Sequence, residues 1–218
     1  MGITINSFRK KVLIEKLIAS GISDKKVLDA IYKVKRELFI GDEFKKFAYE
    51  NNALPIDCNQ TISQPYTVAI MTELLNVKPG NKILEIGTGS GYQCALLKEL
   101  GADVYSVERI NELYLQSKKN LELLNYEVNL KCDDGTKGWE EFAPFDGILV
   151  TAGSPKVPET LVSQLKMNGI LVIPVGSKEF QEIWQVIKIP GKTGDSELII
   201  NKFKDFKFVP LIGSEGWQ

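Results

Sequence analysis

The sequence predicts an α/β protein in which a doubly wound, mostly parallel sheet ends in an antiparallel hairpin. Three observations lead to this fold class. Short apolar runs alternate with helix-like segments from residue 82 onwards, which is typical of a parallel sheet wound with helices. The run at 145–153 is almost continuously apolar, as strands covered on both faces are. Two later runs flank the stretch GKTGD at 191–195, which indicates a hairpin at the sheet edge.

The individual elements follow from spacing and from helix-terminating residues. Amphipathic spacing predicts a helix over 6–20, stopped by Gly21, and a second helix running to Leu38 behind the cap residues Ser23 and Asp24. Residues 41–63 show no period, so we expect a loop with one short helix. A further helix is predicted over 65–75. The expected strands are then 82–87, 103–109, 127–134, 145–153, 169–176, 183–190 and 196–203, and the expected helices are 92–101, 110–125 and 158–169.

Composition and charge narrow the classes of function. The 218 residues include 27 Lys and Arg against 28 Asp and Glu, a net charge of −1. The chain lacks the basic excess typical of nucleic-acid binding, so we expect no nucleic-acid partner. No run approaches the roughly 18 apolar residues of a membrane span, so we expect no membrane contact and a cytoplasmic location. A monomer is the default expectation.

The sequence contains no histidine. This excludes Ser-His-Asp and Cys-His catalysis within one chain, and it excludes metal sites built on imidazole. The cysteines Cys58, Cys94 and Cys132 are odd in number and form no CxxC pair, so neither a disulfide framework nor a zinc site is indicated. We expect no metal, and any chemistry near neutral pH must proceed without an imidazole that moves protons.

A glycine-rich turn, EIGTGSGY at 85–92, lies between an expected strand and an expected helix. Gly87, Gly89 and Gly91, with Thr88 among them, let the backbone turn tightly and approach a ligand closely. The spacing differs from the GxGxxG of dinucleotide folds and lacks the GK[ST] of a phosphate loop. Glu85 would repel a pyrophosphate and attract an ammonium or sulfonium group. The alternative is a tight turn packed for its own sake.

Two further acidic positions end the next two expected strands. Glu108 lies about 20 residues beyond the first glycine, where a carboxylate can accept hydrogen bonds from ribose hydroxyls. The stretch Asp133-Asp134-Gly135 ends the third strand, where a carboxylate or amide can meet the amino group of an adenine. The alternatives are an exposed acid beside Arg109 and an ordinary Asp-Gly turn. Taken together, the ordered set fits S-adenosyl-L-methionine (AdoMet) and predicts a class I AdoMet-dependent methyltransferase, whose Rossmann-like sheet also ends in an antiparallel hairpin.

Several stretches now carry a more specific resemblance. The chain resembles the protein-L-isoaspartate (D-aspartate) O-methyltransferases from its first loop nearly to its last residue. TISQPY at 61–66 and FVPLIG at 208–213 make the match specific, because the glycine-rich block alone would indicate only a methyltransferase. The stretches that carry it are RELFI (36–40), TISQPY (61–66), LEIGTGSGYQCALL (84–97), YSVER (105–109), DDGTKGW (133–139), APFDGILVTAG (143–153), QLKMNGILVIPVG (164–176) and FVPLIG (208–213).

The resemblance implies a repair enzyme that methylates the free α-carboxylate of L-isoaspartyl and D-aspartyl residues in damaged proteins and peptides. The sequence shows no linker, repeat or low-complexity segment, so we expect one domain over 1–218, with N-terminal helices and an active-site loop over 1–64 and an AdoMet-binding core with C-terminal strands over 65–218. Ser63 would be the catalytic residue, and Thr61, Ile62 and Gln64 would contact the substrate. The implied cofactor-binding residues are Glu85, Gly87, Thr88, Gly89, Gly91, Glu108, Asp134 and Gly135.

The chemistry of the residues agrees with this implication. A carboxylate with a pKa near 4 is already ionised at neutral pH, so the reaction needs no general base. The protein has only to align the nucleophile with the methyl group. Small neutral donors such as the Ser63 hydroxyl can hold the carboxylate without blunting it. Ser63 as a helix N-cap is the alternative, since Gln64 and Pro65 should begin the next helix.

Other interpretations stay open at this point. The chain could be an AdoMet-dependent methyltransferase acting on a small molecule or RNA, or a binding module with no enzymatic activity. We interpret Tyr66 and Tyr92 as packing residues rather than as walls of a ligand site. We assign no cofactor contact to Ile212 or Glu215, because the segment after FVPL varies within the family.

Overall fold

The computed structural model describes residues 5–191 and 195–218. Its centre is a seven-stranded sheet in the order β5-β4-β3-β6-β7-β8-β9. The pairs from β5 to β7 are parallel, and β8 and β9 add antiparallel strands at one edge. The expected doubly wound sheet with a closing antiparallel pair is confirmed. The turn expected at 191–195 falls mainly on residues 192–194, which lie outside the described residues.

The elements lie in the expected order. The helices are α1 (Ile5–Ala19), α2 (Lys25–Lys33), α3 (Pro65–Leu75), α4 (Tyr92–Glu99), α5 (Asn111–Leu123) and α6 (Glu159–Ser163), with 3₁₀ turns η1 (Arg36–Leu38), η2 (Asp42–Phe47), η3 (Gly135–Lys137) and η4 (Glu140–Phe142). The strands are β1 (Leu54–Pro55), β2 (Thr61–Ile62), β3 (Lys82–Ile86), β4 (Asp103–Glu108), β5 (Asn129–Cys132), β6 (Phe145–Val150), β7 (Leu165–Gly176), β8 (Gln181–Pro190) and β9 (Ser196–Phe206).

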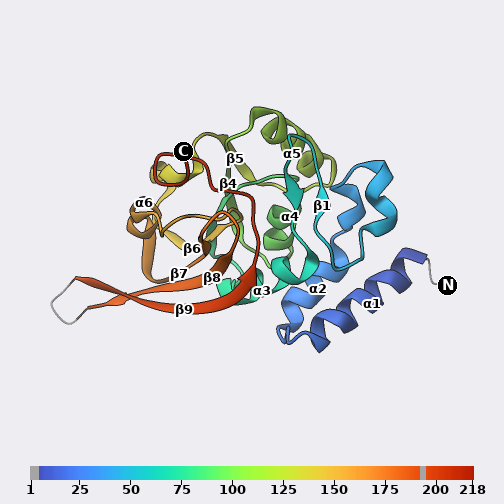
Figure 1. Ribbon diagram of the computed structural model, residues 1–218, viewed down its shortest axis with the longest axis horizontal. Helices are drawn as coiled ribbons and strands as arrows, with labels where there is room; N and C mark the ends of the chain where they lie inside the picture. The colour runs from blue at the N-terminus through green and yellow to red at the C-terminus, as the bar shows by residue number, and fades with distance from the viewer. Residues whose placement is uncertain (1–4, 192–194) are drawn as a thin grey trace.

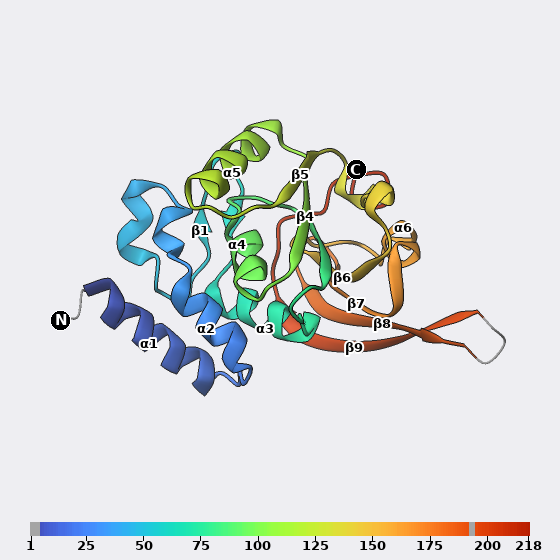
Figure 2. The ribbon, with the colours of Figure 1, turned by 180° about the vertical axis from the view of Figure 1, so that it is seen from behind.

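The sheet is covered on both faces. Neighbouring residues on a strand enter opposite apolar clusters: Ile83 packs with the helices α1 to α4, whereas Leu84 packs with α6 and the 3₁₀ turns around Trp139. This alternation explains why the central strands read as continuous apolar runs. Figures 1 and 2 show α1 and α2 at one end of the molecule and the distal ends of β8 and β9 projecting from the other. In the described part of the chain, no helix combines the length and apolarity of a bilayer crossing.

The second helix ends earlier than expected. Asp24 caps it as predicted, but α2 stops at Lys33 rather than continuing to Leu38, and Val34 is already extended. The reason is the fully buried side chain of Arg36, whose guanidinium donates to the carbonyls of Ala48, Asn52 and Ser63. Continuing the helix would turn this fork away from its three acceptors. Arg36 therefore ties the 48–63 loop to the helical layer.

The helix expected over 158–169 is mostly wrong. Only Glu159–Ser163 is helical, and β7 begins at Leu165, twelve residues long. The ammonium of Lys188 on β8 donates to the carbonyls of Val162 and Leu165, which satisfies acceptors at the end of this short helix. Asn168 has a positive φ of 63°, and the ladder between β6 and β7 shifts register between Phe145 and Gly147. These tertiary contacts override the local helical spacing.

The aperiodic segment 41–63 is a loop, as expected, with η2 as its one 3₁₀ turn. It also contains the two-residue ladder between β1 and β2, which pairs Leu54 with Ile62. This ladder was not predicted, because two residues are too few to show a period. It brings Thr61 and Ile62 to the start of α3.

Replacing Arg36 with Leu should destabilise the fold strongly. The substitution leaves three carbonyls without their donor, and a buried polar group that loses its partner costs about 1–3 kcal/mol. We expect the free energy of unfolding, measured by urea denaturation, to fall by about 3 kcal/mol or more. Arg9→Leu is the matched control, because the Arg9 guanidinium also donates to a carbonyl, that of Lys46, but on the exposed surface. Equal losses for the two variants would contradict the anchoring role of Arg36.

Candidate active site

A pocket opens at the carboxyl ends of β3, β4 and β6. Chain connections leave β3 towards β4 on one side and β6 on the other, so this is the point where the sheet changes direction and where α/β folds bind ligands. The open hollow, counted together with the solvent space at its mouth, is about 940 Å³. Its walls come from the glycine-rich turn, the end of β4, the loop at 60–63 and the segment at 209–212.

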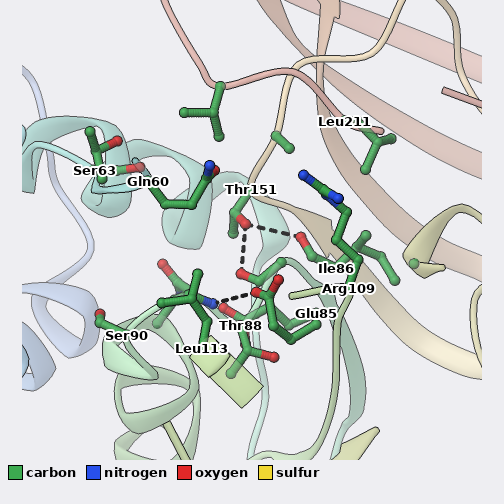
Figure 3. Close-up of a pocket in the computed structure, with 18 of the residues that line it drawn as sticks. Gln60, Ser63, Glu85, Ile86, Thr88, Ser90, Arg109, Leu113, Thr151 and Leu211 are labelled. Carbon is green, nitrogen blue, oxygen red and sulfur yellow. Dashed lines mark hydrogen bonds between the residues drawn. The ribbon is translucent and has the colours of Figure 1, made fainter. Parts of the chain in front are cut away.

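The glycine-rich turn is built on backbone conformations that favour glycine. Gly87 has a φ of +96°, and a Cβ there would lie 2.3 Å from the Thr151 hydroxyl oxygen. That hydroxyl donates to the carbonyls of Ile86 at 2.9 Å and Gly87 at 2.8 Å (Figure 3). Gly91 has a φ of +87°, and a Cβ there would press on Leu121 of α5. Gly87 therefore shapes the pocket floor, whereas Gly91 lets α4 pack against α5.

Glu85 is fully buried beneath this turn. One carboxylate oxygen accepts hydrogen bonds from the thiol of Cys94 at 2.6 Å and the hydroxyl of Ser106 at 2.7 Å. The other, Oε1, has no partner among the described residues. Burial raises the pKa of Glu85 to about 7, although the bonds from Cys94 and Ser106 oppose the rise. An unpaired buried carboxylate oxygen at the pocket suits a ligand that brings positive charge or a donor.

Glu108 ends β4 and is almost fully buried. Its Oε2 accepts the Gly89 N–H at 2.9 Å, and its Oε1 accepts the Ile110 N–H at 2.9 Å. The carboxylate thereby joins the glycine-rich turn to the start of α5. Each carboxylate oxygen has further acceptor capacity, and Glu108 lines the pocket. This is compatible with the expected contact to ribose hydroxyls.

The loop ahead of α3 forms the opposite wall. Figure 3 places Gln60 and Ser63 on one side of the pocket and Arg109 and Leu211 on the other, with Glu85 and Thr88 below. Arg36 Nη1 donates to the Ser63 carbonyl at 3.2 Å and so fixes the backbone there. Gln64, not Ser63, is the N-cap of α3, and Pro65 is its first residue. The alternative of Ser63 as a side-chain cap is therefore wrong, and no described residue bonds its hydroxyl.

Most residues expected at the site line this single pocket. They are Thr61, Ile62, Ser63, Glu85, Gly87, Thr88, Gly89, Glu108 and Gly135. Gln64, Gly91 and Asp134 do not line it. Asp134 accepts hydrogen bonds from Thr136 and from the Ser214 N–H, so its carboxylate is engaged with the protein. Direct contacts of Gln64, Gly91 and Asp134 with a ligand stay predictions.

Several lining residues were not identified from the sequence. Gln60, Ser90, Arg109 and Thr151 line the pocket. Gln60 directly precedes TISQPY, and the other three lie inside stretches that carry the family resemblance, which is the signal that could have found them. Ile212 also lines it, although we assigned it no contact. Tyr92 is buried in the core, as expected, and still borders the pocket. Tyr66 stacks on Phe206, in agreement with a packing role.

The pocket has the features that AdoMet requires. It offers a close backbone turn without Cβ atoms, one unpaired buried carboxylate oxygen and a second acid with acceptor capacity. A phosphate-bearing ligand would instead meet two carboxylates, which is unfavourable. The residues present therefore fit this cofactor.

Comparisons with known proteins give the family. The family model described as "Protein-L-isoaspartate(D-aspartate) O-methyltransferase (PCMT)" matches residues 8–216. A protein-L-isoaspartate O-methyltransferase of Dictyoglomus turgidum is 50% identical over 212 residues, which covers 97% of this chain and 94% of the relative. One from Cytophaga hutchinsonii is 47% identical over 209 residues, covering 96% and 93%.

Solved structures agree with these matches. A protein-L-isoaspartate O-methyltransferase superposes with a TM-score of 0.84 at 31% identity, covering 95% of this chain and 67% of that one. A protein-L-isoaspartate O-methyltransferase from Plasmodium falciparum, solved in complex with S-adenosyl-L-homocysteine, gives a TM-score of 0.78 at 28% identity, covering 93% and 97%. The chain therefore belongs to the protein-L-isoaspartate(D-aspartate) O-methyltransferase family.

Proposed function

We propose that this chain transfers a methyl group from AdoMet to the free α-carboxylate of L-isoaspartyl and D-aspartyl residues in damaged proteins and peptides. Family membership over residues 8–216 gives the reaction and the cofactor. The observation that carries the site is the meeting, in one pocket, of the glycine-rich turn, the buried carboxylates and the Ser63 loop. The pocket therefore combines a binding site for a cationic cofactor with a wall of neutral hydrogen-bond donors on the opposite side.

The cofactor side of the pocket is held by the residues after β3 and β4. When bound, AdoMet supplies a methyl group that its sulfonium has already activated. Glu85 would offer its unpaired oxygen to positive charge, and Glu108 would accept from hydroxyl groups. Gly87 and Gly89 would let backbone amides come close to the ligand.

The substrate side is formed by the 60–63 loop. A substrate carboxylate arrives ionised, so the loop has to orient it rather than deprotonate it. The Ser63 hydroxyl would donate to one carboxylate oxygen and leave the other free to attack. A neutral donor suits this task, because a full positive charge would lower the reactivity of the nucleophile. Arg36 supports the position of Ser63 through its carbonyl.

Three statements remain predictions of the sequence. A cytoplasmic location rests on the lack of a long apolar run, the lack of a nucleic-acid partner rests on the near-zero net charge, and a monomeric state is only the default expectation. The second candidate function, methylation of a small molecule or RNA by the same cofactor, is an outcome of the test below.

The function is tested with two peptides that differ only in one Asp or isoAsp linkage. With radiolabelled AdoMet, we expect methyl transfer to the isoaspartyl peptide and at most trace transfer to the normal peptide, because the loop must present a carboxylate displaced by one methylene. Equal labelling of both peptides, or labelling only of small molecules or RNA, would contradict the proposal. The methyl ester formed is labile to base, which identifies the product.

Ser63 and Glu108 should affect different kinetic constants. Ser63→Ala removes a donor to the reacting carboxylate, so we expect kcat to fall by about tenfold or more with little change in the Kd of AdoMet by calorimetry. Glu108→Gln should weaken AdoMet binding by about tenfold or more. Ser163→Ala is the control for Ser63, because Ser163 bonds only the Thr160 carbonyl on the exposed side of α6. A loss of AdoMet affinity in Ser63→Ala would contradict the assignment, because it would show that the Ser63 hydroxyl contacts the cofactor rather than the substrate.

Glu85 should make both stability and cofactor binding depend on pH. Its folded pKa of about 7 lies above the ordinary value of 4.5, so the folded state holds the proton more tightly than the unfolded state. Stability should therefore fall as pH rises from about 4.5 to about 7, by about 3 kcal/mol relative to Glu85→Gln. The affinity for AdoMet should rise over pH 6 to 8 in the wild type and stay level in Glu85→Gln.

Urea denaturation and calorimetry across this pH range measure the two effects. Glu122→Gln, an exposed acid on α5, is the control and should follow the wild type in both. A wild-type stability profile parallel to that of Glu85→Gln would show that the buried carboxyl does not titrate in this range.

A further inference from the structure

The C-terminal segment 209–217 forms one wall of the pocket, and we call it the C-terminal strap. Its first part, Val209 to Ile212, lines the hollow. The strap joins the β6 end of the sheet through two bonds, Gly153 N–H to the Val209 carbonyl and Leu211 N–H to the Gly153 carbonyl, each at 2.8 Å. The trace in Figure 1 runs back across the carboxyl end of the sheet to reach this place.

Beyond Ile212 the strap folds back on itself. Trp217 N–H donates to the Leu211 carbonyl at 2.7 Å, and its indole N–H donates to the Gly153 carbonyl at 3.0 Å. The Gly213 N–H donates to the Trp217 carbonyl. Residues 211–217 therefore form a small closed loop. The position of this loop should determine where the lining residues Leu211 and Ile212 lie.

Asp134 holds that loop. Its Oδ2 accepts the Ser214 N–H at 2.8 Å, while its Oδ1 accepts the backbone N–H and the hydroxyl of Thr136. The Thr136 hydroxyl oxygen also accepts the Glu215 N–H at 3.2 Å. Burial tends to raise the pKa of Asp134, but these bonds outweigh it and lower the pKa. The carboxylate is thus committed to the strap and to η3.

The approach of the strap to Asp134 is close enough to require glycine. A Cβ on Gly213 would lie 2.1 Å from Asp134 Oδ1 and 2.7 Å from Thr136 Cγ2. A second anchor lies on the far side, where the Glu215 carboxylate accepts the Glu159 N–H at 2.7 Å and the Thr160 hydroxyl. Two carboxylates and one close contact therefore fix the strap from opposite sides.

We infer that Asp134 is a positioning residue that shapes the cofactor pocket through the C-terminal strap, by holding Ser214 so that Leu211 and Ile212 form the pocket wall. Asp134 does not itself line the pocket, and the experiment separates this anchoring role from the expected contact with adenine, which stays a prediction. The inference rests on the proposed function only in that the pocket takes AdoMet. The inference also explains why residue 213 is glycine, since any side chain there would push the strap away from Asp134.

The experiment compares Asp134→Asn, Gly213→Ala and the double variant. Asp134→Asn turns an amide group towards the Ser214 N–H or breaks the bonds to Thr136, whereas Gly213→Ala keeps the carboxylate and disturbs only the approach of the strap. The readouts are hydrogen exchange of the 209–217 peptide without ligand and the Kd of S-adenosylhomocysteine by calorimetry. Neither needs the isoaspartyl reaction, so a failure of the proposed substrate would not alter them.

Both single variants should raise exchange in the 209–217 peptide and weaken S-adenosylhomocysteine binding by about tenfold. The double variant should bind about as weakly as either single one, because the two changes break one shared contact. Asp133→Asn is the matched control, since Asp133 pairs with Lys131 and accepts the Asp134 N–H, which an amide oxygen can also do. It should leave both readouts unchanged.

Three results would overturn the inference. Weaker binding in Asp134→Asn with unchanged exchange of the strap would show that the carboxylate contacts the ligand directly. Additive losses in the double variant would show that the two residues act separately. Normal binding in Gly213→Ala would show that the strap position does not matter. Gly213→Ala keeps the test decisive even where Asp134→Asn folds poorly, which circular dichroism would report.

Discussion

A carboxylate that is already ionised needs no base, and this chemical constraint explains the composition and the site together. The chain has no histidine, yet the reaction of its family asks no side chain to move a proton. What the protein must supply is position: a nucleophile and an activated methyl group held in line. The pocket provides this alignment through the backbone of the glycine-rich turn and through neutral side-chain donors such as the Ser63 hydroxyl, rather than through a catalytic base.

The buried acid Glu85 lowers the stability of the free protein, and a bound cationic ligand would offset this cost. Glu85 leaves one oxygen unpaired beneath the glycine-rich turn, and an unpaired buried carboxylate destabilises a fold. Cys94 and Ser106 offset part of this by bonding the other oxygen, and Ser106 is linked in turn to Thr88 at 2.7 Å. The free protein is therefore less stable than its packing allows, and a cationic ligand would relieve the cost on binding.

The sequence predicted the fold class, the glycine-rich turn and most of the pocket. These features depend on the local spacing of apolar residues and on where along the chain each strand ends. It failed where one long-range contact decides. The buried Arg36 ends α2 early, and Lys188 on a distant strand closes α6 after five residues. The sequence placed Asp134 at the end of a strand over 127–134, whereas β5 ends at Cys132 and Asp134 caps η3. Its bond to Ser214, 80 residues later, cannot be predicted from a local pattern. Ile212 lines the pocket from the same C-terminal strap.

No side chain of the protein should transfer a proton in the methyl-transfer step. The most direct measurement is the solvent deuterium isotope effect on a single turnover, with enzyme in excess over an isoaspartyl peptide so that product release does not mask the step. It should be made well above the Glu85 pKa of about 7. We expect a rate ratio between H₂O and D₂O of about one. A normal effect of about two or more would mean that a protein group moves a proton in the transition state, and would contradict this expectation.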